Sequence, residues 1–259
     1  MIDHSIIAPP DKAKLTFCWI EKVGCTAFKR LFADRDGVGR GRPTGGELRD
    51  AGREHVVFYR DPLDRFLSGF LDKCLGRSRV YCMMIFGAEN KTFDEAVLSL
   101  VGRDKHSMDA HFLQQSDHCD GIGYGNAMDR FTTYRLDPST SREIVAAMLK
   151  RHGLTAPNFD MIFPPNATRT ATAPLGRRHP HAHNTNANGM VEAYYSNPIH
   201  VGIVVDFYLD DYINFKIPLP PYAKRALLGL QRGASPYALD PHCLEALLAI
   251  SPEPPHVGR

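Results

Sequence analysis

Apolar residues gather near the start of the chain in two short runs, each followed by a polar turn and then by apolar positions at helical spacing. The runs cover residues 15–20 and 55–59 and are rich in aromatic and β-branched residues, which indicates buried strands. Helices are expected at residues 27–33 and 62–73, the second opened by Pro62 at a first helical position. This alternation of strands and helices is typical of a parallel sheet covered by helices.

The rest of the chain adds one predicted strand, at residues 130–136, and several helices. Thr92 and Thr140 are each followed three residues later by glutamate, a capping-box pattern that predicts helices to about residues 101 and 152. Other segments are predicted from apolar spacing or from Gly, Pro and Asn content. They are a long helix over residues 197–215, helices from about Tyr222 and after Pro241, and loops at 34–53, 103–127 and 155–189.

Composition narrows the class of protein. The chain of 259 residues has 31 Lys+Arg and 29 Asp+Glu, a net charge of +2 that argues against a general nucleic-acid-binding coat. Residues 1–80 hold 15 basic and 11 acidic side chains, so the positive charge is concentrated at the front. We expect one α/β domain over residues 1–259, with flexible ends at 1–13 and 251–259.

The cysteines and the ends of the chain exclude further classes. No two of the six cysteines are spaced C-x-x-C, which disfavours a zinc ribbon or a thioredoxin-type redox pair. Six are too few for a disulfide scaffold, although one or two bridges stay possible, and Cys18 and Cys25 are interpreted as small core or loop residues. Neither a signal-peptide pattern nor an apolar run of bilayer length is seen, so the sequence as given is expected to be soluble, with its compartment open.

The turn between the first predicted strand and helix has the parts of a phosphate cradle. A helix that begins after such a turn presents unpaired N–H groups at the positive end of its dipole. Gly24 lets the backbone approach a ligand, Thr26 offers a hydroxyl, and Lys22 supplies a positive charge. The motif is not a Walker A loop, and a plain turn with a solvated lysine is the alternative interpretation.

A second basic motif follows the second predicted strand. Arg60 lies at the carboxyl end of that strand, where ligands bind in open α/β sheets, and Ser68 lies two turns into the next helix. An arginine and a hydroxyl suit a second phosphate. The alternative is an N-capping Asp61 with surface ion pairs among the neighbouring arginines and aspartates.

Taken in order, the two motifs resemble those of sulfotransferases. Lys-x-Gly-Cys-Thr-x-x-Lys-Arg, from Lys22, is similar to the 5′-phosphosulfate loop of that family, and Arg-Asp-Pro-x-x-Arg-x-x-Ser-Gly-Phe, from Arg60, to its 3′-phosphate motif. The Cys-Thr variant is most similar to the carbohydrate sulfotransferases of the chondroitin/dermatan 4-O type. Three weaker likenesses extend the resemblance over residues 15–216. They are the segments 108–119, 128–134 and 207–215, which resemble the family's His-Trp-x-Pro segment, its Tyr-Asp-Phe-Val strand and its Tyr-x-x-Asp-Phe-x-x-Phe helix.

The resemblance implies a P-loop-like three-layer α/β/α fold with a central, mainly parallel sheet, and 3′-phosphoadenosine 5′-phosphosulfate (PAPS) as sulfuryl donor. It implies a carbohydrate hydroxyl as acceptor. The donor's 5′-phosphosulfate would be surrounded by Lys22, Gly24, Cys25, Thr26 and Lys29, and its 3′-phosphate would be held by Arg60 and Ser68. The chain departs from the family pattern at Phe112, Gln114 and Arg135, and it lacks both the second Cys of Cys-x-Pro-Cys and the Golgi anchor.

Sulfuryl transfer needs a positive charge at the leaving phosphate and a base for the acceptor hydroxyl. Lys22 is the predicted catalytic cation, and His111 is the first candidate for the base because imidazole titrates near neutral pH. His55 and His106 are reserve candidates. No metal is required, and the alternating histidines at 179, 181 and 183 are interpreted as loop residues rather than as a metal site.

Two other functions remain as alternatives. The first is a nucleotide or small-molecule kinase, which the missing Walker lysine and the missing Asp/Ser pair for Mg²⁺ disfavour. The second is a catalytically weak or inactive protein that binds a nucleotide or a glycan with the same loops. The departures at Phe112, Gln114 and Arg135 keep this second reading open.

Overall fold

The computed structural model describes residues 6–7, 14–33, 50, 52–76, 79–119, 125–137, 140–165 and 187–251. The chain forms two compact units. Unit 1 comprises Met1–Arg60 and His118–Asn184, and unit 2 comprises Asp61–Asp117 and Thr185–Arg259. The chain therefore leaves unit 1 at Arg60, directly after the second predicted strand, and returns to it at His118.

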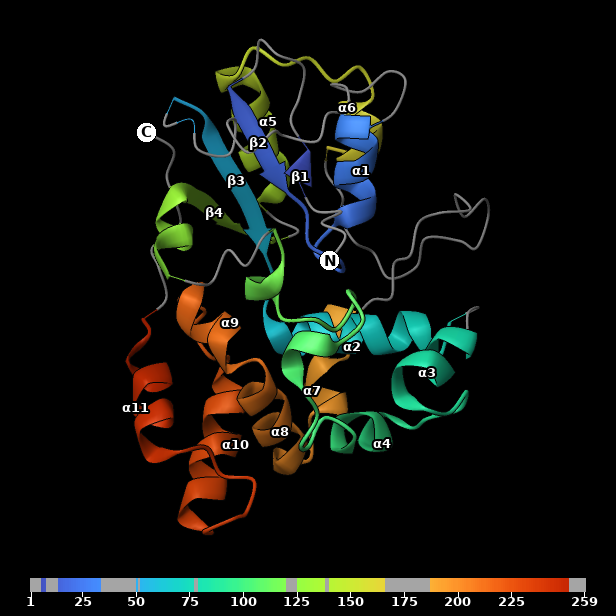
Figure 1. Cartoon of the computed structure of the whole chain (residues 1–259), viewed down its shortest axis with the longest axis vertical. Coiled ribbons are helices and arrows are strands. Elements are labelled where there is room, and N and C mark those ends of the chain that lie inside the picture. The colour runs from blue at the N-terminus through green and yellow to red at the C-terminus, as the bar shows by residue number, and fades with distance from the viewer. Residues whose placement is uncertain are drawn as a thin grey trace. The chain divides into compact units, whose positions relative to one another are not determined.

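Unit 1 is built on a four-stranded sheet in the order β1-β2-β3-β4 (Figure 1). The strands are β1 (Ile6–Ile7), β2 (Leu15–Cys18), β3 (Glu54–Tyr59) and β4 (Phe131–Arg135). β2 and β4 each pair with β3 in parallel, and β1 pairs with β2 antiparallel. The three strands predicted from apolar runs are thus confirmed, and the sheet is mainly parallel.

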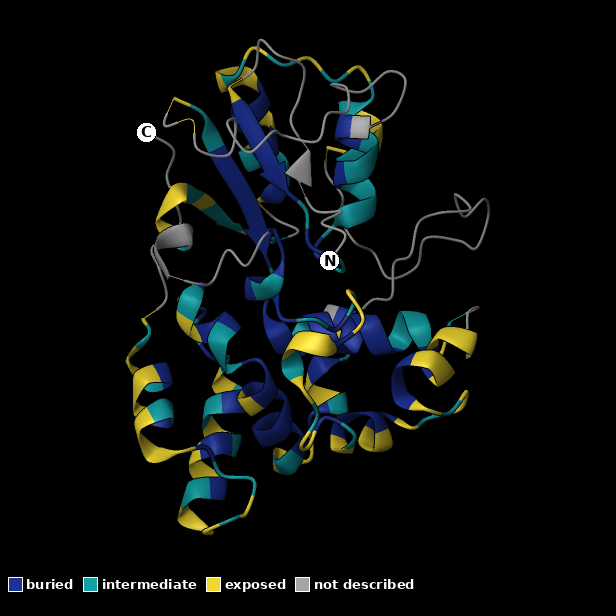
Figure 2. Cartoon of the chain, in the orientation of Figure 1, coloured by how far each residue is buried: buried dark blue, intermediate teal, exposed yellow. Residues whose placement is uncertain are grey.

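The helices of unit 1 are α1 (Cys25–Ala33), α5 (Ser141–Arg151) and α6 (Phe159–Ile162). α1 packs on the sheet through aromatic rings. The ring centroid of Phe17 on β2 lies 4.5 Å from that of Phe28 and 4.9 Å from that of Phe32. β2 and most of β3 are buried, as Figure 2 shows. At the other end of β3, Glu54 accepts hydrogen bonds from Arg151 and lies 2.6 Å from Nε2 of His152, which holds the end of α5. A mainly parallel sheet with flanking helices confirms the α/β class.

Two disulfides join four of the six cysteines. Cys18, at the end of β2, is bonded to Cys119 in unit 1, and Cys74 is bonded to Cys82 in unit 2. Cys18 is a buried core residue, as the sequence interpretation expected, and it is also bonded to a partner 101 residues away in sequence. Cys25 keeps a free thiol.

Unit 2 is helical in its described residues, and its helices pack around α8 (Pro198–Phe207). Seven of that helix's residues are buried, and Figure 2 shows them in dark blue. α8 packs on α2, α4 and α10. The other helices are α2 (Pro62–Lys73), α3 (Arg79–Phe86), α4 (Phe93–Leu98), α7 (Val191–Tyr194), α9 (Leu209–Asn214), α10 (Pro221–Arg232) and α11 (Pro241–Ala249), with short 3₁₀ turns η2 (Lys105–Ser107) and η3 (Gln115–Asp117).

The long helix predicted over residues 197–215 is interrupted at Tyr208, whose φ of −104° and ψ of 25° leave the helical region. The side chain of Tyr208 is buried, and its hydroxyl donates a 2.6 Å hydrogen bond to the carbonyl of Phe112. This contact, which the apolar period does not reveal, accompanies the division into α8 and α9.

Of the two predicted capping boxes, one forms. Thr92 and Glu95 exchange both hydrogen bonds at the start of α4. Thr140 makes no side-chain cap bond, so that prediction was wrong. The hydroxyl of the next residue, Ser141, bonds to the carbonyl of Asp137 instead. The sequence pattern also missed α3, α6 and α7, which are short. None of the helices in the described part of the chain combines the length and apolar character needed to cross a bilayer.

Candidate functional site

The turn from Trp19 to Gly24 connects the end of β2 to the start of α1 in unit 1. The amide of Val23 bonds to the carbonyl of Ile20 at 3.1 Å. Lys22 and Gly24 both have positive φ, 66° and 68°. For lysine this backbone region is uncommon and costs energy, which makes the conformation of Lys22 a strained feature of the predicted phosphate loop.

Gly24 is required by the fold itself. A Cβ at this position would lie 3.3 Å from Cε2 of Phe28 and 3.5 Å from Cδ2 of Leu136, in addition to the strain of its positive φ. The sequence interpretation explained this glycine by the approach of a ligand. In the structure, the chain reversal and the packing of Phe28 and Leu136 already account for it.

The first residues of α1 are Cys25 and Thr26, both half-buried. The first turn of a helix has N–H groups without intrahelical partners and carries the positive end of the helix dipole. No acidic residue of α1 lies in its first turn. The helix therefore presents donors suited to an anion at the position that the sequence predicted.

Glu21 is a site residue that the sequence interpretation missed. Its Oε1 lies 3.0 Å from Nζ of Lys29, whose ammonium is also 4.3 Å from the centre of the Trp19 ring. Burial raises the pKa of the Cys25 thiol, and Glu21 raises it further by its charge and a side-chain hydrogen bond. The loop that is basic in sequence is thus partly neutralised by its own carboxylate.

Arg60 joins the two predicted motifs. It directly follows β3, and its Nη1 donates a 3.4 Å hydrogen bond to the carbonyl of Lys22. Because β2 and β3 are parallel neighbours, their carboxyl ends meet at one edge of the sheet. The structure therefore brings Lys22, Gly24, Cys25, Thr26, Lys29 and Arg60 to this edge of unit 1.

Ser68, the other predicted phosphate ligand, lies in unit 2 and is buried within α2. The same helix is capped by Asp61, which accepts hydrogen bonds from the amides of Leu63 and Asp64, as the alternative interpretation of this motif expected. The surface ion pair proposed for Arg65 is wrong, because its side chain is only 1% exposed. It donates instead to the carbonyls of Leu113 and Ala110, at 2.6 and 3.1 Å.

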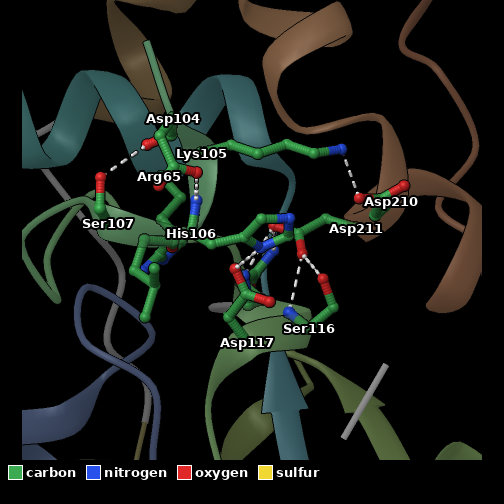
Figure 3. Close-up of polar contacts among 11 residues, drawn as sticks. Arg65, Asp104, Lys105, His106, Ser107, Ser116, Asp117, Asp210 and Asp211 are labelled. Atoms are coloured by element: carbon green, nitrogen blue, oxygen red, sulfur yellow. Dashed lines mark hydrogen bonds and ion pairs between the residues drawn. The ribbon is translucent and has the colours of Figure 1, made fainter. Parts of the chain in front are cut away.

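Those two carbonyls belong to the segment 104–117, which carries two candidate bases. Asp211 on α9 is fully buried and accepts hydrogen bonds from the amides of Gln115 and Ser116, at 2.9 and 2.8 Å. Figure 3 shows the contact between Asp211 and Ser116. Lys105 pairs with Asp210 at 2.6 Å. Burial raises the pKa of Asp211, while the charge of Arg65 and the amide donors oppose that rise. The segment is therefore anchored from α2 and from α9.

Each candidate base in this segment is paired with an aspartate. Nδ1 of His111 lies 2.6 Å from Oδ1 of Asp109, and Nδ1 of His106 lies 3.0 Å from Oδ2 of Asp117. The His111 side chain is 24% exposed and that of His106 is 48% exposed. The third candidate, His55, is buried in β3, where burial and nearby arginines lower its pKa.

Two of the departures from the family pattern lie inside unit 2. Phe112 is fully buried, with ring centroids 5.5 Å from Phe66 and 5.0 Å from Phe86. Gln114 is fully buried, and its amide has no hydrogen-bond partner in the described structure. The third departure, Arg135, is exposed at the end of β4. The first two therefore concern packing.

Unit 2 also contains an open pocket of about 350 Å³, which none of the sequence-predicted residues lines. Phe93, Tyr194 and His200 form part of its wall. Within the described residues, no three His, Cys, Asp or Glu side chains are grouped as a metal site would need. The histidines at 179, 181 and 183 lie outside the described residues.

Comparison with known proteins gives one match. A family model described as "Sulfotransferase family" matches residues 3–217, which is more than four fifths of the chain. Searches of curated proteins and of solved structures returned no match. The matched range includes the turn before α1, the arginine after β3 and the histidine segment. On this evidence the chain belongs to the sulfotransferase family.

Proposed function

We propose that this sulfotransferase moves the sulfuryl group of PAPS to a hydroxyl of a carbohydrate acceptor, of the chondroitin/dermatan 4-O type that the sequence resembles. The observation that supports this best is the hydrogen bond from Arg60 to the carbonyl of Lys22. This bond holds Arg60, the first residue of the second motif, beside the turn that carries Lys22, which suits a donor with both a 5′-phosphosulfate and a 3′-phosphate.

In this proposal the amides at the start of α1 and the side chains of Lys22 and Thr26 bind the 5′-phosphosulfate, with Gly24 ending the turn and Cys25 beginning the helix beside it. Arg60 and Ser68 bind the 3′-phosphate. Lys29 contributes less charge than its place in the motif suggests, because Glu21 lies 3.0 Å from its ammonium. A bound anion would compete with Glu21 for Lys29.

The reaction transfers SO₃ in line from the donor phosphate to the acceptor oxygen. The hydroxyl oxygen forms a bond to sulfur, the bond from sulfur to the bridging phosphate oxygen breaks, and the hydroxyl proton passes to a base. Lys22 stabilises the charge that develops on the leaving phosphate. His111 takes the proton at Nε2, and the products are a sulfate ester and adenosine 3′,5′-bisphosphate.

The alternative of a binding protein without turnover has less support than the sequence alone suggested. Two of the departures that favoured it, Phe112 and Gln114, are fully buried, and so they alter packing in unit 2. Arg135 is exposed and lies beside the end of β3, so it is the departure that can bear on a ligand.

Ligand-dependent stability tests the donor site. Adenosine 3′,5′-bisphosphate at about 100 times its dissociation constant should stabilise the protein by about 2.7 kcal/mol. For a protein of this size, we expect a rise of about 5–10 °C in the unfolding midpoint. ATP with Mg²⁺ should give a smaller rise. A larger rise with ATP and Mg²⁺ would favour the kinase alternative.

Turnover is tested with ³⁵S-labelled PAPS and a panel of chondroitin, dermatan and simple alcohols. Lys22→Ala should lower kcat by at least tenfold, since it removes the cation at the leaving group. Lys150→Ala is the matched control, because this lysine is exposed on α5 and lies outside both motifs. Equal loss in both variants, or normal turnover in Lys22→Ala, would contradict the proposed role.

A further inference from the structure

The segment 104–117 contains two histidine–aspartate pairs that differ in their geometry. At His111, one oxygen of Asp109 accepts from both the backbone amide, at 2.9 Å, and Nδ1 of the ring, at 2.6 Å. At His106, the ring pairs with Asp117 but the backbone amide pairs with a different residue, Asp104. Asp109 therefore orients both the backbone and the ring of His111.

The bond to Asp109 determines which nitrogen of His111 carries the proton. Burial disfavours the Asp109 carboxylate, but the hydrogen bonds from His111 outweigh this effect and lower the pKa of Asp109. An ionised carboxylate only accepts hydrogen bonds, so Nδ1 must hold the hydrogen. In the neutral ring, Nε2 is then left with its lone pair.

The charges around this pair come from α2 as well as from the segment itself. Lys73 on α2 acts on Asp109, and it is itself paired with Asp72 at 3.2 Å. The ammonium of Lys73 also lies 4.7 Å from the centre of the Tyr81 ring. The charges of Lys73 and Asp72 therefore largely balance each other, and Asp109 supplies the negative charge beside the His111 ring.

The part of the segment around His111 is held on both sides. Arg65 binds the carbonyls of Ala110 and Leu113, which flank His111. The hydroxyl of Tyr208 binds the carbonyl of Phe112. A base that is fixed in backbone and in ring needs little reorganisation when it takes a proton.

We infer that Asp109 is a positioning residue that holds His111 with Nδ1 protonated, so that Nε2 receives the proton of the acceptor hydroxyl. The inference rests on the proposed function and extends it by naming the residue that orients the catalytic base. The arrangement is that of the histidine and aspartate in a Ser-His-Asp triad, in which aspartate selects the tautomer.

The test replaces the carboxylate with an amide. In Asp109→Asn the amide can donate to Nδ1 and select the opposite tautomer, so kcat should fall about 10²–10⁴-fold. The KM for PAPS and the thermal shift with adenosine 3′,5′-bisphosphate should stay unchanged. Asp109→Glu should recover part of the rate.

Asp117→Asn is the matched control, because it makes the same change beside His106. Full activity in Asp109→Asn, or the loss of rate in Asp117→Asn instead, would overturn the inference. A second measurement does not depend on turnover: ¹H–¹⁵N spectra of histidine-labelled protein, with His111 assigned from His111→Ala. The wild type should show a protonated Nδ1, and an unchanged tautomer in Asp109→Asn would overturn the inference.

These results separate the inference from the proposed function. If the wild type neither binds adenosine 3′,5′-bisphosphate nor transfers sulfate from PAPS, the proposed function fails. If the wild type is active and Asp109→Asn is equally active, the proposed function stands and the positioning role fails.

Discussion

Glu21 is the single residue that most changes the picture of the phosphate loop. In sequence, the turn before α1 and the helix itself contain Lys22, Lys29 and Arg30, which suggested a basic cradle. In the structure, the Glu21 carboxylate lies 3.0 Å from the Lys29 ammonium and also acts on the Cys25 thiol. Lys22 and Arg60 are therefore the basic residues on which the proposed donor site chiefly depends.

Cys25 provides a direct probe of this turn. Because burial and then Glu21 raise the pKa of its thiol, little thiolate is present at neutral pH, and alkylation should accelerate only at alkaline pH. Glu21→Gln should move the labelling curve of Cys25 with iodoacetamide to lower pH. The measurement is peptide mass spectrometry over a pH series.

Cys243 serves as the internal control, because it is the other free thiol among the described residues and lies on α11. Glu21→Gln should leave its labelling unchanged. Adenosine 3′,5′-bisphosphate should slow the labelling of Cys25 and not that of Cys243. Equal protection of both thiols would speak against a ligand at the turn.

At the scale of elements, α2 links the second basic motif to the histidine segment. Its Arg65 binds two carbonyls of that segment, and its Gly69 lies against the ring of Phe112. A Cβ on Gly69 would be 2.8 Å from Cε1 of Phe112, which is closer than any relaxed contact. The Ser-Gly-Phe part of the motif thus includes a packing requirement besides any ligand.

Gly69→Ala should therefore destabilise unit 2 by about 1–3 kcal/mol through overpacking, although alanine favours the helix more than glycine does. Gly229→Ala on α10 is the matched variant, because a Cβ there meets no atom within 4 Å. It should stabilise the protein by about 0.5–1 kcal/mol. Urea unfolding followed by far-UV circular dichroism measures both, and destabilisation by the two changes alike would contradict this account.

At the scale of the whole molecule, each unit contains one disulfide. Cys18–Cys119 spans 101 residues in sequence, and Cys74–Cys82 spans 8. In the chain-entropy account, a disulfide stabilises by restricting the unfolded chain, by about 3 kcal/mol for a 15-residue loop and about 4.7 kcal/mol for a 100-residue loop. All four cysteines are buried, so their replacement by alanine leaves comparable gaps.

We therefore expect Cys18→Ala with Cys119→Ala to cost about 2 kcal/mol more than Cys74→Ala with Cys82→Ala. Trp19, the single tryptophan of the chain, reports unit 1 by fluorescence, and far-UV circular dichroism reports the helices. In urea unfolding, the Trp19 transition should report the stability lost when Cys18 and Cys119 are replaced. A larger cost for the Cys74–Cys82 pair would contradict the loop-length argument.

Local signals in the sequence were sufficient for the elements that build the proposed donor site. Buried strands at β2 and β3 follow from short apolar runs, and Pro62 with Asp61 marks the start of α2. The long helix predicted over residues 197–215 and the cap predicted at Thr140 were wrong, because an apolar period and a capping pattern describe one segment alone. The hydroxyl of Tyr208 bonds to the carbonyl of Phe112, and that of Ser141 bonds to the carbonyl of Asp137, and neither partner is part of the sequence pattern that was used.

The sequence by itself determined the α/β class, the place of the two basic motifs directly after two predicted strands, and the sulfotransferase resemblance; that these strands are neighbours in the sheet came from the structure. Strand pattern, turn chemistry and motif spacing are properties of the chain read in order. Only the tertiary structure decided that Glu21 pairs with Lys29, that Cys18 bonds to Cys119, that Arg65 is buried, and that Asp109 and Asp117 pair with different histidines. These pairings depend on distance and burial in three dimensions, and neither composition nor the period of apolar residues contains that information.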